Sequence, residues 1–296
     1  MENIGFEKGK DDNKCRFFDN LHPISDIVTR DPHSPMSDFL RKRFPHAVRP
    51  LPRDVFAQVT PFRHGERLIW HRHRHGQLVF PVRGIVRVLT PSAIWTLPPS
   101  RALWLPSDIE HELHAVGDGQ MGNLYMEPRA FPWDWTSPTV ILVTPLIREL
   151  AVTVSRDGDT YGPTSRAALS VPPLMGLLHD AAPVPERGVP VPGDARLQAI
   201  CEHLMNEPAS KLTLDFWGEQ FGVSARTLAR QFRTETGMTF VTWRQHLRVS
   251  EAISTLAQGA SVATTADAFG YASPSAFIAM FKQVTGRSPQ RYLADA

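Results

Sequence analysis

Between residues 55 and 128, short runs of apolar, β-branched and aromatic side chains alternate with glycine, proline, serine and aspartate. This pattern predicts short β-strands, and their regular spacing favours a β-sandwich or a β-barrel. The strands that we expect cover residues 77–83, 86–90, 94–97, 102–105 and 124–127.

The pattern changes after Pro138, where apolar residues recur at helical spacing. Thr144 can cap a helix and Pro145 suits its first position, so we expect an amphipathic helix over residues 144–155. Its apolar stripe consists of Leu146, Ile147, Leu150, Ala151 and Val154. This stripe either covers an edge of the barrel or pairs with a copy of itself in a homodimer.

From residue 196 onward the pattern is typical of helices with short breaks, and it contains an internal repeat. Gly218 and Gly222 are matched in the second copy by Ala266 and Gly270. Three further residues of the first copy, Phe232, Gly237 and Trp243, have counterparts 49 residues later in Phe281, Gly286 and Tyr292.

Each copy contains the residues that a helix-turn-helix requires. Such a unit needs a small residue where its helices cross, a glycine that ends the first helix, a capping Ser or Thr, and an apolar inner side. In the first copy Gly222 would end one helix, Ser224 would start the next, and Leu228 and Phe232 would be buried. The opposite side of that helix is then available to the major groove of DNA.

The expected DNA contacts lie on the outer sides of the two second helices and on the helix between the units. Arginine binds guanine and phosphate, so the first unit has the richer surface. A helix over residues 240–257 would hold the two recognition helices about one helical turn, ~34 Å, apart. The expected set is Ser224, Arg226, Thr227, Ala229, Arg230, Arg233, Arg244, Arg248 (a phosphate contact), Ser273, Ser275, Ala276, Ala279 and Lys282.

Residues 196–294 resemble the DNA-binding domain of the AraC/XylS family of transcription regulators. The resemblance rests on GVSARTLARQFRTETG, WRQHLRVSEAISTL and FGYASPSAFIAMFKQVTGRSPQRY, which cover about a third of the chain. It implies a sequence-specific regulator that binds double-stranded promoter DNA, has an N-terminal sensing domain, and contacts RNA polymerase if it is an activator.

The resemblance also assigns base contacts. It places Arg226, Ala229 and Arg230 at the bases in the first unit, and Ser275, Ala276 and Ala279 in the second. Many family members have arginine where this chain has Ala279. The second unit is therefore expected to bind mainly phosphates or thymine methyl groups.

Histidines cluster in the predicted strand region. His71, His73, His75 and Gln77 would share one face of a strand, and His111 and His114 follow later. The spacing is similar to the cupin pattern His-x-His-x3-Glu-x6-Gly, completed by Gly84 and by Pro106 with His111. Gln77 replaces the usual carboxylate and Asp108 a usual glycine. This resemblance implies a cupin-like barrel in which His71, His73, Gln77 and His111 are candidate ligands of a divalent metal ion.

These polar groups also have roles that need no metal. They can hydrogen-bond within the mouth of the barrel, or orient an organic effector beside aromatic side chains, as in many small-molecule pockets. The expected effector-binding residues are His71, His73, Gln77, Trp95, Trp104, His111 and Tyr125.

Composition limits the remaining possibilities. A formal net charge of +2 over 296 residues is too small for a general attraction to nucleic acid, so DNA contacts must be local. Cys15 and Cys201 match no disulfide or zinc spacing, and no apolar run approaches the ~18 residues of a membrane span. We therefore expect a cytoplasmic protein without a membrane partner.

Three functions fit these features. The first is a homodimeric regulator, not an enzyme, that responds to a small molecule or a metal in its barrel. The second is a metal-dependent cupin enzyme fused to a DNA-binding domain, which the histidines favour and the missing carboxylate base disfavours. In the third, the barrel serves only dimerisation.

The expected fold class is α+β, with a β-barrel followed by an all-α domain of two helix-turn-helix units. We expect five segments: a partly ordered leader (1–53), a cupin-like sensing barrel (54–130), a helical linker and dimerisation segment (131–182), a proline-rich connector (183–195) and the DNA-binding domain (196–296).

Overall fold

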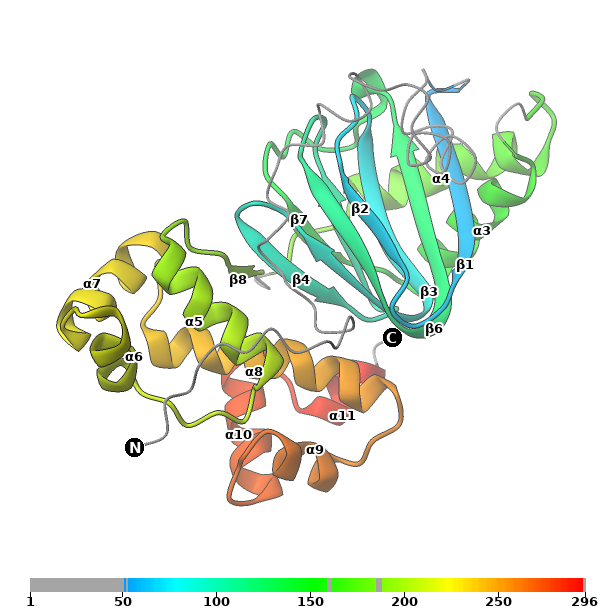
Figure 1. Ribbon diagram of the computed structural model, residues 1–296. Coiled ribbons are helices and arrows are strands. Elements are labelled where there is room, and N and C mark those ends of the chain that lie inside the picture. Colours follow the sequence, from blue (N-terminus) through cyan, green and yellow to red (C-terminus); the bar gives the residue numbers. More distant parts are fainter. Residues whose placement is uncertain (1–50, 52, 159–160, 185–187, 295–296) are drawn as a thin grey trace.

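The computed structural model describes residues 51, 53–158, 161–184 and 188–294, and it contains a sheet domain and a helical domain (Figure 1). The expected α+β class is confirmed. The expected leader, residues 1–53, falls almost entirely outside the described residues. Within the described residues, none of the helices combines the length and apolar character that crossing a membrane requires.

Among the described residues, eight antiparallel strands form the sheet domain. The two long strands, β3 and β6, pair with each other along most of their length and so run through both halves of the sheet. Strands β1, β5 and β7 lie beside one half, and β2, β4 and β8 lie beside the other. The strands are β1 (Val55–Phe62), β2 (Arg67–His71), β3 (Gly76–Leu89), β4 (Ala93–Leu97), β5 (Arg101–Leu105), β6 (His111–Met126), β7 (Thr139–Leu142) and β8 (Val189–Pro190).

A bulge in β3 keeps its apolar residues on the correct faces. Val79 and Val86 both belong to the inner core, although residues seven positions apart fall on opposite faces of a regular strand. Between them, Gly84 has a φ of 83° and the pairing with β6 shifts register. Leu78 and Ile85 both lie on the outer side of the sheet as a result. Ile85 packs against the helical domain, and Leu78 packs on a second outer face at the other half of the sheet.

The helices α3 (Pro145–Arg156) and α4 (Arg166–His179) cover this second outer face (Figure 1). Thr144 caps α3 as expected, since its hydroxyl accepts a hydrogen bond from the backbone N–H of Ile147. The buried residues of α3, Ile147, Ala151 and Val154, share a core with α4 and the sheet. This part of the apolar stripe therefore covers the sheet, which was one of the two expected roles, whereas Leu146 is exposed.

Two short strands were not expected. β7 lies in the segment expected to be purely helical, and β8 lies in the segment expected to be a connector. β8 pairs with β4, and the backbone N–H of Val191 bonds to the carbonyl of Ser92. The boundary between the domains is therefore tied into the sheet. Proline is tolerated there because β8 is an edge strand.

The helical domain contains the two expected helix-turn-helix units. α6 and α7 form the first, α9 and α10 the second, and α8 connects them (Figure 1). The inner residues Leu228, Phe232, Phe277 and Phe281 are completely buried, as the repeat predicted. The helices are α5 (Ala195–Asn206), α6 (Leu214–Phe221), α7 (Ala225–Thr236), α8 (Phe240–Ala257), α9 (Val262–Ala268), α10 (Pro274–Thr285) and α11 (Pro289–Ala294).

Candidate functional site

Helix α7 exposes its arginines because its first turn and its apolar side are held in place. Gly222 ends α6 with a φ of 66°, and the hydroxyl of Ser224 accepts the backbone N–H of Thr227 at 3.1 Å. Leu228 and Phe232 are buried in the core of the first unit. The side chains on the opposite side of α7, Arg226, Ala229, Arg230 and Arg233, are exposed.

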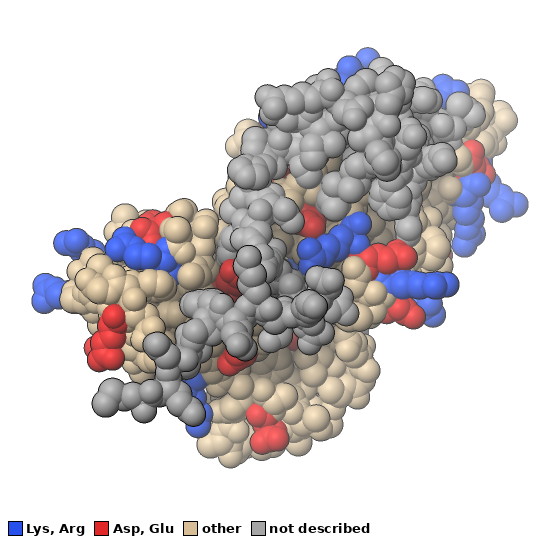
Figure 2. Space-filling view, in the orientation of Figure 1, with Lys and Arg blue, Asp and Glu red and all other residues tan. Residues whose placement is uncertain are grey.

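These four residues form one wall of a groove of about 570 Å³. The start of α8 forms the opposite wall. It consists of the capping residue Thr239 and the apolar residues Phe240 and Val241. Figure 2 shows Lys and Arg side chains at the end of the helical domain where α7 lies. The α8 wall was not among the expected contacts, although the capping residue Thr239 marks the start of that helix in the sequence.

The second unit has a recognition helix that is capped in the same way as α7, but its exposed side has fewer charged residues. The Ser273 hydroxyl caps α10 by accepting the backbone N–H of Ala276 at 3.2 Å. All five predicted residues of this unit are exposed, but they include a single charge: Ser273, Ser275, Ala276, Ala279 and Lys282. Figure 2 accordingly shows mainly uncharged surface over α9 and α10.

Arg244 and Arg248 on α8 are only partly exposed, and both bond within the protein. The Nε and Nη2 groups of Arg248 donate to the carbonyl oxygens of Pro208 at 2.7 Å and Ser210 at 3.2 Å. Its guanidinium also lies over the ring of Tyr271, at 5.6 Å from the centroid. This placement argues against the expected phosphate contact of Arg248. Arg244 lines the α7 groove but also donates to the carbonyl of Leu212.

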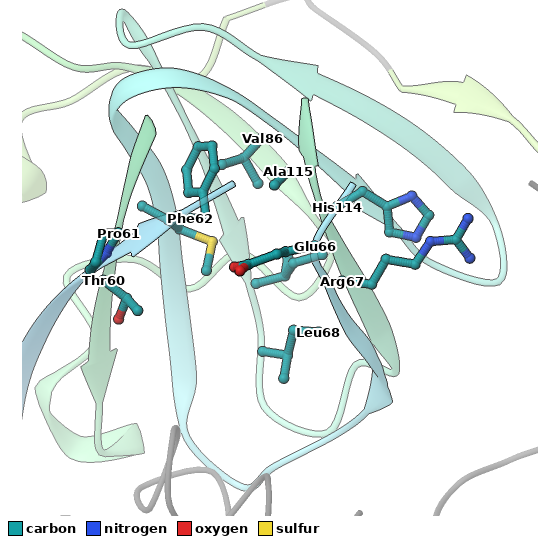
Figure 3. A pocket seen from close by; sticks show the side chains of 11 residues that line it. Thr60, Pro61, Phe62, Glu66, Arg67, Leu68, Val86, His114 and Ala115 are labelled. Carbon is teal, nitrogen blue, oxygen red and sulfur yellow. The ribbon is translucent and has the colours of Figure 1, made fainter. Parts of the chain in front are cut away.

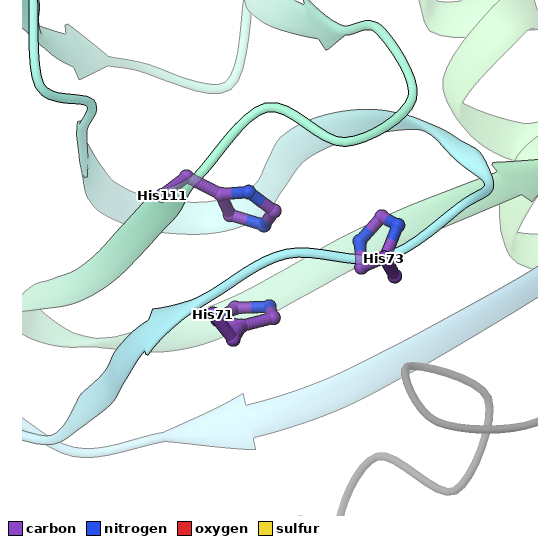
Figure 4. Close-up of side chains that lie close together, drawn as sticks. All are labelled: His71, His73 and His111. Carbon is purple, nitrogen blue, oxygen red and sulfur yellow. The ribbon is translucent and has the colours of Figure 1, made fainter. Parts of the chain in front are cut away.

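Three of the predicted histidines meet in the sheet domain. His71 ends β2, His73 lies in the loop to β3, and His111 begins β6. One ring nitrogen from each lies within 4.8 Å of the other two, and all three side chains are buried (Figure 4). The chain leaves the strand at His71, so the expected strand alternation does not produce this cluster. His75 instead approaches the carboxylate of Glu127 at 3.3 Å.

Backbone carbonyls orient two of the rings. Nδ1 of His111 bonds to the carbonyl of Ile109, and Nδ1 of His73 to that of His75, both at 2.8 Å. Burial, and next the neighbouring His71 and His73, hold the pKa of His111 well below its usual value. Burial also lowers the pKa of His73. Both rings are therefore neutral at neutral pH, with a lone pair on one nitrogen.

Gln77 lies beside the cluster and is completely buried. Its amide oxygen is 2.8 Å from Nε2 of His73, and its amide nitrogen donates to Oδ1 of Asn123 at 2.7 Å. Asn123 was not expected to take part. Asn123 reaches Gln77 because β3 pairs with β6, and the local sequence pattern does not reveal that pairing.

The predicted aromatic residues do not all join the histidines. Tyr125 does, with its ring centroid 5.5 Å from that of His73. Trp104 is opposite Leu78 in the sheet and packs against Phe131 and Trp133 under the helices, away from the histidines. Trp95 lines a separate small cavity with residues of α8.

A second cavity in the sheet domain was missed. It has a volume of about 220 Å³ and is lined mainly by apolar side chains, including Phe62, Leu68 and Met121 (Figure 3). Figure 3 shows the Glu66 carboxylate directed into it, with Arg67 and His114 at one edge. A cavity of about 150 Å³ can hold benzene, so this one has room for a small ring compound.

Comparison with known proteins agrees with both domains. Residues 62–166 match the family model of the AraC-like ligand binding domain, and residues 217–295 match that of a helix-turn-helix domain. The chain is 33% identical to the HTH-type transcriptional regulator NimR of Escherichia coli (strain K12) over 227 residues, which are 76% of this chain and 81% of NimR. The chain belongs to the AraC/XylS family of transcription regulators.

More distant relatives of this AraC/XylS regulator include the arabinose operon regulatory protein of Salmonella typhimurium (strain LT2). It is 25% identical over 58% of this chain and 65% of its own length. Among solved structures, fatty-acid-bound ToxT from Vibrio cholerae covers 83% of this chain and 97% of its own, with 12% identity and a TM-score of 0.34. NimR and the arabinose operon regulatory protein are both named as regulators, and neither supports the cupin enzyme that was the alternative.

In this AraC/XylS regulator, α8 connects the sensing domain to the helix-turn-helix units. Nη2 of Arg87 on β3 contacts both carboxylate oxygens of Glu251 on α8, at 2.7 and 2.8 Å. The hydroxyls of Thr96 and Ser250 are 2.6 Å apart. These contacts join residues more than 150 positions apart, so no local pattern in the sequence could show them.

Proposed function

We propose that this regulator recognises promoter DNA chiefly through α7, with Arg226, Ala229 and Arg230 at the bases. The observation that carries the proposal is the division of α7 into a buried apolar side and an exposed side whose arginines line a groove. Arginine is the commonest residue to contact guanine in the major groove, and it also binds phosphates. Arg233 and Lys282 would supply phosphate contacts.

The second unit would hold the protein on DNA with less sequence preference. The exposed side of α10 has hydroxyls, methyl groups and one lysine, which suit phosphates and thymine methyl groups. We propose that both units bind one face of the duplex, that the regulator acts in the cytoplasm as a homodimer, and that it contacts RNA polymerase if it activates transcription.

For the sensing domain, we propose a small-molecule or metal effector at the histidine cluster. The supporting observation is the convergence of three buried imidazoles with Gln77 and Tyr125, which gathers polar groups inside the sheet domain. Binding there would reach the DNA-binding domain through the strands that contact α8, because β3 begins at the cluster and also carries Arg87.

The DNA proposal can be tested with Arg230→Ala. A preferred site would first be selected from a randomised duplex library with the full chain. Loss of a bidentate guanine contact should weaken binding to that site by ~1–3 kcal/mol and relax the preference at one base position. Quantitative gel shifts on the selected site and on random duplex would measure both effects.

The matched control is Arg156→Ala, which removes an exposed arginine from α3 in the sensing domain. It should leave DNA binding unchanged. If Arg230→Ala lost equal affinity for the selected and the random duplex, Arg230 would not be a base-contacting residue.

A further inference from the structure

The histidine cluster has the geometry of a metal site whose donors are all uncharged. The ring centroid of His111 lies 4.2 Å from that of His71 and 5.3 Å from that of His73 (Figure 4). Zinc–nitrogen bonds of about 2.0–2.1 Å would bring three ligand nitrogens to about 3.3 Å from one another. The nitrogens already lie within 4.8 Å of one another, so small rotations of the rings suffice.

The surroundings orient the donors in the way that metal sites do. Histidine ligands usually donate their other ring N–H to a carbonyl or carboxylate, which fixes the tautomer and the ring orientation. Nδ1 of His111 and of His73 both bond to backbone carbonyls, which leaves each Nε2 as the lone-pair nitrogen. Nε2 of His111 is buried and has no hydrogen-bond partner among the described residues, an arrangement that a bound cation would explain.

Gln77 supplies a fourth donor. When Nδ1 of His73 donates to the carbonyl of His75, its Nε2 lone pair faces the Gln77 oxygen at 2.8 Å, and a cation bound to both removes the repulsion. That separation is also close to the spacing of two ligand atoms on one metal ion. Asn123 accepts from the amide nitrogen of Gln77 and so holds the oxygen toward His73.

We propose that His71, His73, His111 and the amide oxygen of Gln77 bind one divalent transition-metal ion of the zinc, cobalt or nickel class, with Asn123 as a positioning residue. Imidazole nitrogen favours these ions over magnesium and calcium, which prefer oxygen. The site deepens the proposed effector site, because it names the ligand class that the cluster recognises. It would also tie the end of β2, the loop and the start of β6 together.

The test is a titration of the full chain, purified without a His tag and stripped with a chelator, with Co²⁺ alone. We expect one Co²⁺ to bind per chain and to show the visible absorption of a low-symmetry nitrogen site. One Zn²⁺ should displace the Co²⁺, and Zn²⁺ should raise the melting temperature of the protein. His111→Ala should weaken binding more than ~100-fold, and Asn123→Ala about 10-fold, since outer-shell changes cost about 10–100-fold.

Two further variants complete the experiment. Gln77→Glu adds a negative charge to the donor set and should tighten binding. His179→Ala removes an exposed histidine of α4 and should change nothing. The proposal is overturned if the wild type binds neither ion or if His111→Ala binds like the wild type. If His111→Ala does not fold, unchanged affinity in both Gln77→Glu and Asn123→Ala overturns it.

The titration contains no DNA, and the Arg230→Ala test needs no metal. A failed titration therefore leaves the DNA proposal standing, and the reverse also holds.

Discussion

Within α7, residues one or two positions apart have opposite environments, and this division decides which side chains are exposed. Arg230 is exposed beside the groove, whereas Leu228 two residues earlier is completely buried. Arg248 on α8 has the same chemistry as Arg230 but bonds to two carbonyl oxygens of the loop between α5 and α6. The same residue type is thus exposed beside a groove in one helix and bonded within the protein in the other.

This difference predicts opposite effects for Arg248→Ala and Arg233→Ala. Arg248→Ala should lower the free energy of unfolding by ~1–3 kcal/mol, because Pro208 and Ser210 lose their donor. Arg233→Ala should leave stability unchanged and reduce the slope of log affinity against log salt by about 1, as expected for a lost phosphate contact. Urea unfolding and DNA binding at several salt concentrations would measure these effects. A reduced salt slope with unchanged stability in Arg248→Ala would contradict the assignment.

Residue types at fixed spacing were informative where the chemistry is local. Ser224 and Gly222 have the capping and helix-ending roles expected of them, because such roles depend on neighbours within four positions. The position of Trp104 away from the histidines was not foreseen, because it depends on the pairing with Leu78, which the local pattern does not contain. Asn123 was missed for the same reason, since it meets Gln77 only through the pairing of β6 with β3.

At the scale of elements, the repeat was the strongest signal because each copy must bury the same side of its recognition helix. The counterparts Phe232 and Phe281 are both fully buried, and Trp243 and Tyr292 also lie in the core. The strands were harder to foresee. The two residues of β8 have no alternation to detect, and the bulge at Gly84 merges two expected strands into β3.

The dimer prediction belongs to this scale. The buried stripe of α3 is used by the sheet domain, so a homodimer through this helix would have to use its outer face, where Leu146 is 58% exposed. We predict that the wild type sediments as a dimer and that Leu146→Asp makes it a monomer. The change should alter stability by no more than about 0.5 kcal/mol, because Leu146 is a surface residue.

The control for this prediction is Leu169→Asp on α4, which alters another exposed leucine and should leave the dimer intact. Sedimentation velocity at micromolar concentration, with and without DNA, is the measurement. A wild type that is monomeric under both conditions would exclude a dimer through α3.

At the scale of the whole molecule, the sensing and DNA-binding domains share packed cores rather than a free linker. Ile85 of β3 lies in one core with Val249 and Ile253 of α8, and Trp243 donates to the carbonyl of Pro190 in β8 at 2.7 Å. The ion pair of Arg87 and Glu251 sits beside this core, with side-chain exposures of 11% and 19%. The sheet is therefore in direct contact with α8, the helix that connects the two units.

This arrangement predicts that Arg87→Glu and Glu251→Arg each weaken the docking of the domains. Each single change places like charges opposite one another at a partly buried site and removes a charged hydrogen bond worth about 1.5–3 kcal/mol. Calorimetry should show the helical domain unfolding at a lower temperature than the sheet domain in each variant. The double exchange restores opposite charges in reversed positions, so it should return a single transition near that of the wild type. If the double variant were as unstable as the sum of the single ones, the ion pair would not couple the domains.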